Sequence, residues 1–138
     1  MEISVKWQQG LRFTGTSRFG HEISIDASRE AGGNQDGYQP VELLMFALAG
    51  CTGMDVINIG RKMRLDITGL KINVNYDQKE DPPKVIAKAH LDYAITGRDL
   101  DPQKIERAIQ LSEEKYCSVG ATLAGVTKIT HSYTITEG

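Results

Sequence analysis

The sequence predicts an α+β fold in which strands surround one long central helix. Three observations predict this class: short alternating runs at the start, a long apolar helical segment in the middle, and strongly alternating strands after it. The order of elements is strands, helix, strands, helix and strand, and no segment is repeated. We expect one domain over 1–138, composed of strands over 1–26, a loop over 27–39, a central helix over 40–63, strands over 67–97, a helix over 101–117 and a C-terminal strand over 126–136.

The first strands are predicted from the alternation of apolar and polar residues. Ile3, Val5 and Trp7 alternate with polar neighbours, and further short alternating runs follow before residue 26. The segment 15–20 contains two glycines and is typical of a hairpin turn. The segment 26–39 is rich in glycine but has no phosphate-binding spacing, so we interpret it as a mobile connector.

The central helix is predicted to start at Pro40, which suits the first helical turn, with Glu42 near the positive end of the helix dipole. Residues 43–49 are apolar on every face of this helix. A helix of this kind needs cover on all sides, and one small sheet covers only one side. The sequence therefore predicts an extensive homodimer in which a second subunit covers the helix.

The second half of the chain contains the clearest strands. Apolar residues alternate over 70–76 and 85–95, with a Pro-Pro turn between the two segments. Asp101 and Pro102 are typical of a helix cap and first turn. Apolar residues over 129–135 mark the last strand.

The composition excludes several classes of function. Lysine and arginine total 16 and aspartate and glutamate total 18, so no basic stripe for nucleic acid is present. The two cysteines cannot form a closed zinc site or a disulfide scaffold. The first ten residues lack the apolar core of a signal peptide, and the apolar run 43–51 is far shorter than the roughly 20 residues of a membrane helix. We expect a cytoplasmic protein that binds neither nucleic acid nor membrane.

The two cysteines are the first candidates for chemistry. Cys51 lies 11 residues beyond Pro40, too far from the helix start for the dipole to activate its thiol. Cys117 lies near a predicted helix end, 66 residues further on. Each thiol alone is typical of a small buried core residue. If the two sulfurs meet, a sulfenic acid on one could condense with the other to a disulfide, but the spacing does not establish that they meet.

Charged residues supply the remaining candidates. Arg18 is the best cation for stabilising a thiolate, although an arginine in a turn is usually solvated. Glu42 could orient that arginine, but it lies on the opposite helix face from Cys51. Asp55 lies one turn beyond Cys51, where an unpaired carboxylate would raise the thiol pKa; a solvated or hydrogen-bonded Asp55 is equally compatible. The three histidines have no metal-ligand spacing.

Two pairs of segments resemble the OsmC/Ohr family. The stretches 39–44 (QPVELL) and 47–52 (ALAGCT) resemble the helix that bears the family's reactive cysteine, and 96–100 (TGRDL) and 112–119 (SEEKYCSV) resemble its second-cysteine region. The order of elements also agrees over nearly the whole chain. Within the family, the sequence looks closest to the YhfA-like branch rather than to Ohr itself.

The resemblance implies a fold with antiparallel sheets around a long buried helix, an intertwined homodimer, and two active sites at the subunit interface. It implies thiol-dependent reduction of organic hydroperoxides in oxidative or osmotic stress defence, with Cys51 as the peroxidatic thiolate and Cys117 as the resolving thiol. Arg18 would stabilise the thiolate. The family's glutamate partner for this arginine corresponds to Val41, so Glu42, one residue later, would have to replace it.

The remaining expectations concern ligands. Leu44 and Leu48 would line a site for the apolar part of a hydroperoxide, although both residues could instead belong only to the core. An external thiol or dithiol would restore the cysteines, and no metal, flavin or haem is required. The alternative is a non-catalytic protein of the same fold that binds a small apolar ligand at the dimer interface, with incidental thiols.

Overall fold

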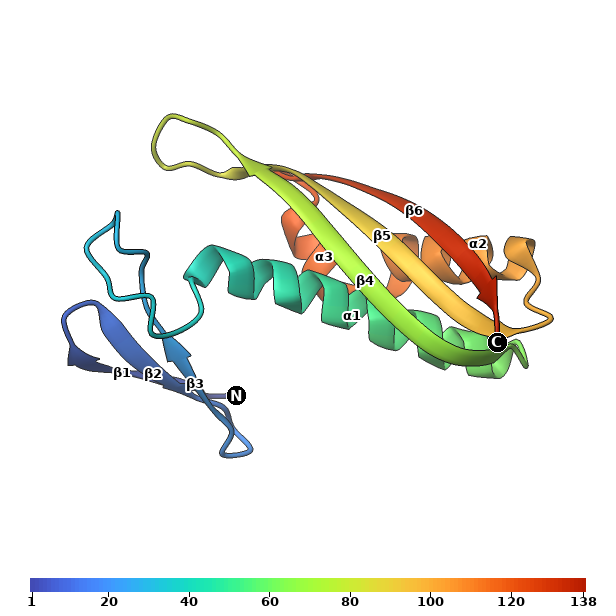
Figure 1. The fold of residues 1–138 in the computed structure, drawn as a ribbon, viewed down its shortest axis with the longest axis horizontal. Helices are drawn as coiled ribbons and strands as arrows, with labels where there is room; N and C mark the ends of the chain where they lie inside the picture. Colours follow the sequence, from blue (N-terminus) through green and yellow to red (C-terminus); the bar gives the residue numbers. More distant parts are fainter. The chain divides into compact units, whose positions relative to one another are not determined.

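A computed structural model describes residues 1–138, which form two compact units over 1–44 and 45–138. A single domain over 1–138 stays a prediction. The elements are β1 (Ser4–Gln9), β2 (Arg12–Thr16), β3 (Glu22–Ile25), α1 (Pro40–Lys62), β4 (Asp66–Gln78), β5 (Ile86–Arg98), α2 (Pro102–Leu111), the one-turn π-helix η1 (Ser112–Tyr116), α3 (Ser118–Leu123) and β6 (Lys128–Glu137). Helices and two separate sheets are present (Figure 1), so the α+β class is confirmed.

The first unit contains a three-stranded antiparallel sheet in the order β1-β2-β3. Gly10, at a φ of 56°, makes the turn between β1 and β2, and the indole Nε1 of Trp7 donates to its carbonyl at 2.8 Å. Every residue of β1 is exposed, including Val5 and Trp7. The apolar side chains that predicted this strand therefore have no cover within the unit.

The connector that follows β3 is organised around a buried carboxylate. Asp26 is 3% exposed and accepts backbone N–H hydrogen bonds from Ala27 at 2.8 Å and from Asn34 and Asp36 at 3.1 Å. These bonds fold the segment 27–37 back onto β3 by joining donors that lie up to ten residues from the acceptor. The interpretation of this segment as a mobile connector is therefore wrong.

Two glycines of the connector are required by close backbone contact rather than by flexibility. A Cβ on Gly33 would lie 2.2 Å from the carbonyl oxygen of Ala27, and a Cβ on Gly37 would lie 2.4 Å from that of Ser24. No side chain fits at either distance. The glycines that suggested mobility instead allow the loop to pack closely.

The pKa of Asp26 is lowered, chiefly because the backbone N–H of Asp36 donates to its charged form. The stability that these bonds supply is therefore fully present above the ordinary aspartate pKa of about 3.9 and is lost as the pH falls through the lowered value. We expect Asp26→Asn to reduce the hydrogen-exchange protection of the Asn34 and Asp36 amides at neutral pH. Asp36→Asn, which keeps its backbone donor, is the control, and equal protection in the wild type and Asp26→Asn would contradict this role.

The second unit contains a sheet in the order β4-β5-β6. Strands β4 and β5 are antiparallel, but β5 and β6 are parallel. The expectation of antiparallel sheets is therefore wrong for this pair. Its physical reason is the connection: α2, η1 and α3 lie between β5 and β6, and a helical crossover of this length returns the chain in the same direction.

The helices of this unit cover one face of the sheet (Figure 1). Ile72, Tyr93 and Tyr133 are paired across the three strands, so their side chains share a face. On that face α1 packs closely against Ile72, since a Cβ at Gly53 would lie 3.2 Å from the Ile72 Cδ1 atom. The start of α2 lies on the same face, where the Tyr133 hydroxyl donates to the Pro102 carbonyl. The opposite face has no helix.

Helix α1 is buried on one face only. Its buried residues are Met45, Leu48, Thr52, Val56, Ile59 and Gly60. Leu44, Phe46 and Met54 on other faces are 44%, 57% and 75% exposed. The all-round burial that its composition predicts is therefore not found within one chain, because the sheet covers one side of the helix.

The length and composition of α1 would also allow it to cross a membrane. An 18-residue window of the helix has a mean hydropathy of 1.6, although the continuous apolar run within it, 43–51, is much shorter. The core helix of a water-soluble fold has the same composition, and α1 buries one face against a sheet as such a helix does.

The helix expected over 101–117 is divided. Asp101 caps α2 by accepting from the backbone N–H of Gln103, but α2 ends at Leu111 and one π-turn follows. The backbone N–H of Cys117 donates to the carbonyl of Ser112 and closes that turn, and Cys117 then adopts an extended conformation as the N-cap of α3. The π-turn therefore sets the position of the second cysteine.

Candidate functional site

The two cysteines meet in the second unit. Cys51 lies in the middle of α1, and Cys117 lies at the junction of η1 and α3. Their sulfur atoms and a carboxylate oxygen of Asp55 all lie within 4.8 Å of one another. Both cysteines are free thiols; Cys51 is half-buried and Cys117 is 3% exposed. The sequence spacing of the two cysteines did not establish that their sulfurs meet, and the fold brings them together.

The environment of Cys117 favours its neutral thiol. Burial first, and the hydrogen bond to Cys51 second, raise its pKa to about 11. The backbone N–H of Gly120 opposes these effects by donating to the Cys117 Sγ at 3.1 Å. Cys117 is therefore protonated near neutral pH and can donate its S–H toward the sulfur of Cys51.

Asp55 joins the two thiols as the third polar group. It is half-buried, and its Oδ2 accepts a 2.8 Å hydrogen bond from the hydroxyl of Ser112. Ser112 is fully buried at the start of η1. Asp55 forms no salt bridge, so the hydrogen-bonded alternative describes it and its charge has no cationic partner in the chain.

A buried tyrosine lies beside this cluster. Tyr93 is 0% exposed, and its hydroxyl makes no hydrogen bond. The pKa of Tyr93 is raised to about 12, chiefly by burial and also by the charges of Glu113, Cys117 and Asp55, while the nearby Thr52 hydroxyl lowers it. The Thr52 hydroxyl donates instead to carbonyls of its own helix. A buried hydroxyl without a hydrogen-bond partner is uncommon in folded proteins.

A cavity of about 100 Å³ adjoins Cys117. Its lining residues are Leu48, Thr52, Leu91, Glu113, Cys117, Gly120, Ala124 and Ile129. The fully buried Leu48 supplies one apolar wall, and Glu113 supplies a charged group at the edge. The cavity has the size of a few waters or of a small peroxide group.

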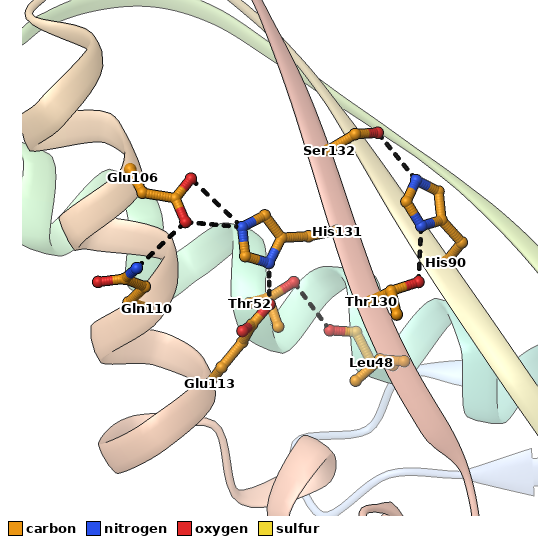
Figure 2. Close-up of polar contacts among 9 residues, drawn as sticks. All are labelled: Leu48, Thr52, His90, Glu106, Gln110, Glu113, Thr130, His131 and Ser132. Atoms are coloured by element: carbon orange, nitrogen blue, oxygen red, sulfur yellow. Dashed lines mark hydrogen bonds and ion pairs between the residues drawn. The ribbon is translucent and has the colours of Figure 1, made fainter.

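His131 fixes the carboxylate at this cavity. Figure 2 shows its ring between two helical glutamates, with Nδ1 2.7 Å from Glu113 and Nε2 3.0 Å from Glu106. Gln110 also donates to Glu106. On the other face of the sheet, both nitrogens of His90 are bonded to hydroxyls, so neither histidine contacts a cysteine in a nucleophile pair.

The other expected site residues lie in the first unit. Arg18 is exposed in the turn before β3 and lies over the ring of Phe19, 4.6 Å from its centroid. Glu42 accepts a 2.9 Å hydrogen bond from the backbone N–H of Gln39 and so caps the start of α1. Leu44 is 44% exposed. Whether Arg18, Glu42 and Leu44 act at the thiols stays a prediction.

The sequence did not indicate Ser112, Tyr93 or Glu113 as members of the site. In the sequence, Ser112 follows the helical periodicity of the segment 101–117 and Tyr93 follows the alternation of 85–95, so both look like ordinary packing residues. A tyrosine among aliphatic residues on the buried face of a strand is the one available signal, because its hydroxyl needs a partner there. Asp55 was considered from its position one turn after Cys51, and the structure places it with the thiols.

Comparisons with known proteins identify the family of the chain. The sequence pattern of the family described as OsmC-like protein matches residues 32–132. Protein YhfA of Escherichia coli K12 is 36% identical over 135 residues, which are 98% of each chain. A solved structure of a hypothetical protein from Aquifex aeolicus is 27% identical, with a TM-score of 0.87 over 99% of this chain and 96% of that one.

A more distant structure has the same fold. It is described as an organic hydroperoxide resistance protein OsmC and predicted redox protein from Legionella pneumophila. It is 17% identical, with a TM-score of 0.75 over 97% of each chain. The family match and the full-length relative together identify the fold as OsmC/Ohr-like, and this chain belongs to the OsmC-like family.

Proposed function

We propose that the protein is a thiol-dependent peroxidase that reduces organic hydroperoxides in oxidative or osmotic stress defence. The observation that carries the proposal is the meeting of Cys51 and Cys117, 66 residues apart in sequence, with their sulfurs within 4.8 Å. The Legionella structure of the same fold is described as a hydroperoxide resistance protein, which supports the same chemistry here.

Cys51 is the attacking thiol in this proposal. Cys117 holds its proton because its pKa is raised to about 11, and it is also the more deeply buried of the two. The sulfur of Cys51 attacks one peroxide oxygen and the O–O bond breaks. Cys51 becomes a sulfenic acid, and the leaving alkoxide takes the thiol's proton and departs as the alcohol.

Cys117 resolves the sulfenic acid. Its sulfur forms an S–S bond with Cys51 while the sulfenic hydroxyl takes the Cys117 proton and leaves as water. A sulfur separation within 4.8 Å requires only side-chain rotation and a small backbone movement to reach the bond length of about 2.05 Å. An external thiol or dithiol then reduces the disulfide to two thiols and is itself oxidised.

Residues of the first unit complete the proposal. Arg18 would favour the Cys51 thiolate and bind the peroxide oxygens, with Glu42 orienting its guanidinium. Glu42 would have to perform this role in addition to the helix cap it forms. Leu44 and Leu48 would contact the apolar part of the substrate, Leu44 from its exposed position and Leu48 from the cavity wall.

A second copy of the chain is proposed as the cover that α1 and the first sheet lack. Met54 and Phe46 of α1 and Trp7 of β1 are more than half exposed. Exposed apolar residues on several elements indicate an interface. We place the protein in the cytoplasm, where its thiols stay reduced between turnovers.

Titration of free thiols before and after one equivalent of cumene hydroperoxide tests the function. We expect the wild type to lose two thiols per chain with release of one cumyl alcohol, and Cys51→Ser to lose none. Unchanged wild-type thiols would contradict the peroxidase and favour a binding protein for a small apolar ligand. Sedimentation of the same sample at micromolar concentration tests the dimer, which a stable folded monomer would contradict.

A further inference from the structure

We propose that the reduced thiol cluster binds one thiophilic divalent cation of the zinc class through the Sγ atoms of Cys51 and Cys117 and a carboxylate oxygen of Asp55. The three ligand atoms lie within 4.8 Å of one another. Sulfur ligands about 2.3 Å from a tetrahedral zinc ion lie about 3.7 Å apart. Side-chain rotations that move these ligand atoms by about 1 Å therefore bring them to coordination distance.

Rigid elements present these ligands. Cys51 and Asp55 are one turn apart on α1, so their side chains project from the same helix face. Cys117 is fixed by the π-turn on one side and by α3 on the other. Two ligands lie on one helix turn and the third lies on a separate element. The site is therefore preorganised for cation binding.

Hydrogen bonds outside the ligand set orient it. Ser112 donates to Oδ2 of Asp55 at 2.8 Å and so holds the carboxylate in place beside the thiols. The backbone N–H of Gly120 donates to the Cys117 sulfur at 3.1 Å and stabilises its thiolate form. Partners of this kind are the usual second layer of a metal site and change affinity by about 10- to 100-fold.

The surroundings of the three ligands also leave room for a fourth ligand of the cation. Sites with three protein ligands complete their tetrahedron with water. The Tyr93 hydroxyl is fully buried and has no hydrogen-bond partner, and Cys117 faces a cavity of about 100 Å³. A water bound to the cation on the Cys117 side would have room in this cavity.

The charge of the cluster also favours the binding of a cation. Asp55 has no cationic partner within the chain, and a bound cation would supply one. Binding of the cation displaces one proton from each thiol. Both sulfurs are occupied in the complex, so cation binding and disulfide formation exclude each other. The inference itself requires only the reduced cluster and does not depend on the proposed peroxidase activity.

Anaerobic titration of the reduced full-length protein with Co²⁺ tests the site. We expect thiolate-to-cobalt charge-transfer absorption that saturates at one equivalent per chain, with release of two protons, and loss of the absorption when Zn²⁺ is added. Protein oxidised beforehand with diamide should show none. Absence of the charge-transfer band in the reduced wild type would overturn the proposal, whatever the hydroperoxide assay shows.

Variants assign the ligands. Cys51→Ser and Cys117→Ser should each lose most of the charge-transfer intensity, and Asp55→Asn should weaken Co²⁺ binding at least tenfold while keeping two thiols. Glu114→Gln, which removes an exposed carboxylate of the same π-turn, is the matched control and should bind as the wild type does. Unchanged affinity in Asp55→Asn, with an unchanged circular dichroism spectrum, would overturn the three-ligand site.

Discussion

A Cys117→Ser variant is expected to reduce one equivalent of hydroperoxide per chain and then stop, whereas Cys51→Ser is expected to reduce none. The difference follows from the two steps of the proposed reaction, because only Cys51 attacks the peroxide and only Cys117 removes the sulfenic hydroxyl. Loss of a nucleophile lowers turnover on the order of 10³-fold or more, so Cys51→Ser should have no measurable activity.

Trapping of the sulfenic acid distinguishes the two variants. Cys117→Ser treated with hydroperoxide should add one dimedone molecule at Cys51, while the wild type should add little because Cys117 captures the sulfenic acid first. Ser118→Ala, at the exposed neighbour of Cys117, is the control and should turn over normally. A dimedone adduct at Cys117 in Cys51→Ser would reverse the assignment of the two thiols.

Leu48→Ala is expected to cost about 2–5 kcal/mol of the free energy of unfolding. Leu48 is 0% exposed, and its Cδ1 would lie 3.7 Å from a Cβ at Gly120, so it joins α1 to α3 beside Cys117. Removing three buried carbon atoms at this position leaves a cavity that the two helices cannot close without moving the thiol. Leu44→Ala, at a position that is 44% exposed, should cost less than about 1 kcal/mol in the same urea denaturation.

The pair of leucine variants separates a core role from a substrate role. If Leu48 serves only to contact substrate, Leu48→Ala would raise KM for cumene hydroperoxide and leave the unfolding midpoint unchanged. That outcome would contradict its place in the packed core. An unfolding midpoint lowered in Leu48→Ala but not in Leu44→Ala agrees with the structure.

The fold was largely predictable from local patterns. The alternation over 70–76 and 85–95 predicted β4 and β5, because a strand with one buried face must alternate. The apolar segment 43–49, opened by Pro40, predicted α1. In each case the signal comes from neighbouring residues, which the sequence displays directly.

The features that escaped prediction depend on residues far apart in the chain. The parallel pairing of β6 with β5 depends on the path of the crossover, and the π-turn before Cys117 contains only ordinary helix-forming residues. Asp26 orders its loop through backbone donors up to ten residues away, which no side-chain pattern reveals. The sequence therefore suggested a flexible connector where the chain is folded closely.

The site was predictable only in part for the same reason. Cys51 and Cys117 were recognised from the segments around them, but their meeting depends on where the π-turn places Cys117 against α1. Ser112 and Tyr93 look like core residues in the sequence because they follow its periodicity. Their polar groups gain significance only when Asp55 and the thiols are seen beside them.

Peptide mapping of the wild type after one equivalent of cumene hydroperoxide tests the central claim most directly. The account predicts one peptide pair joined by a Cys51–Cys117 disulfide within the same chain, which disappears on treatment with dithiothreitol. Two peptides that both keep reduced cysteines, or a Cys51 sulfinic acid with Cys117 still free, would contradict the claim that these thiols act as a redox pair.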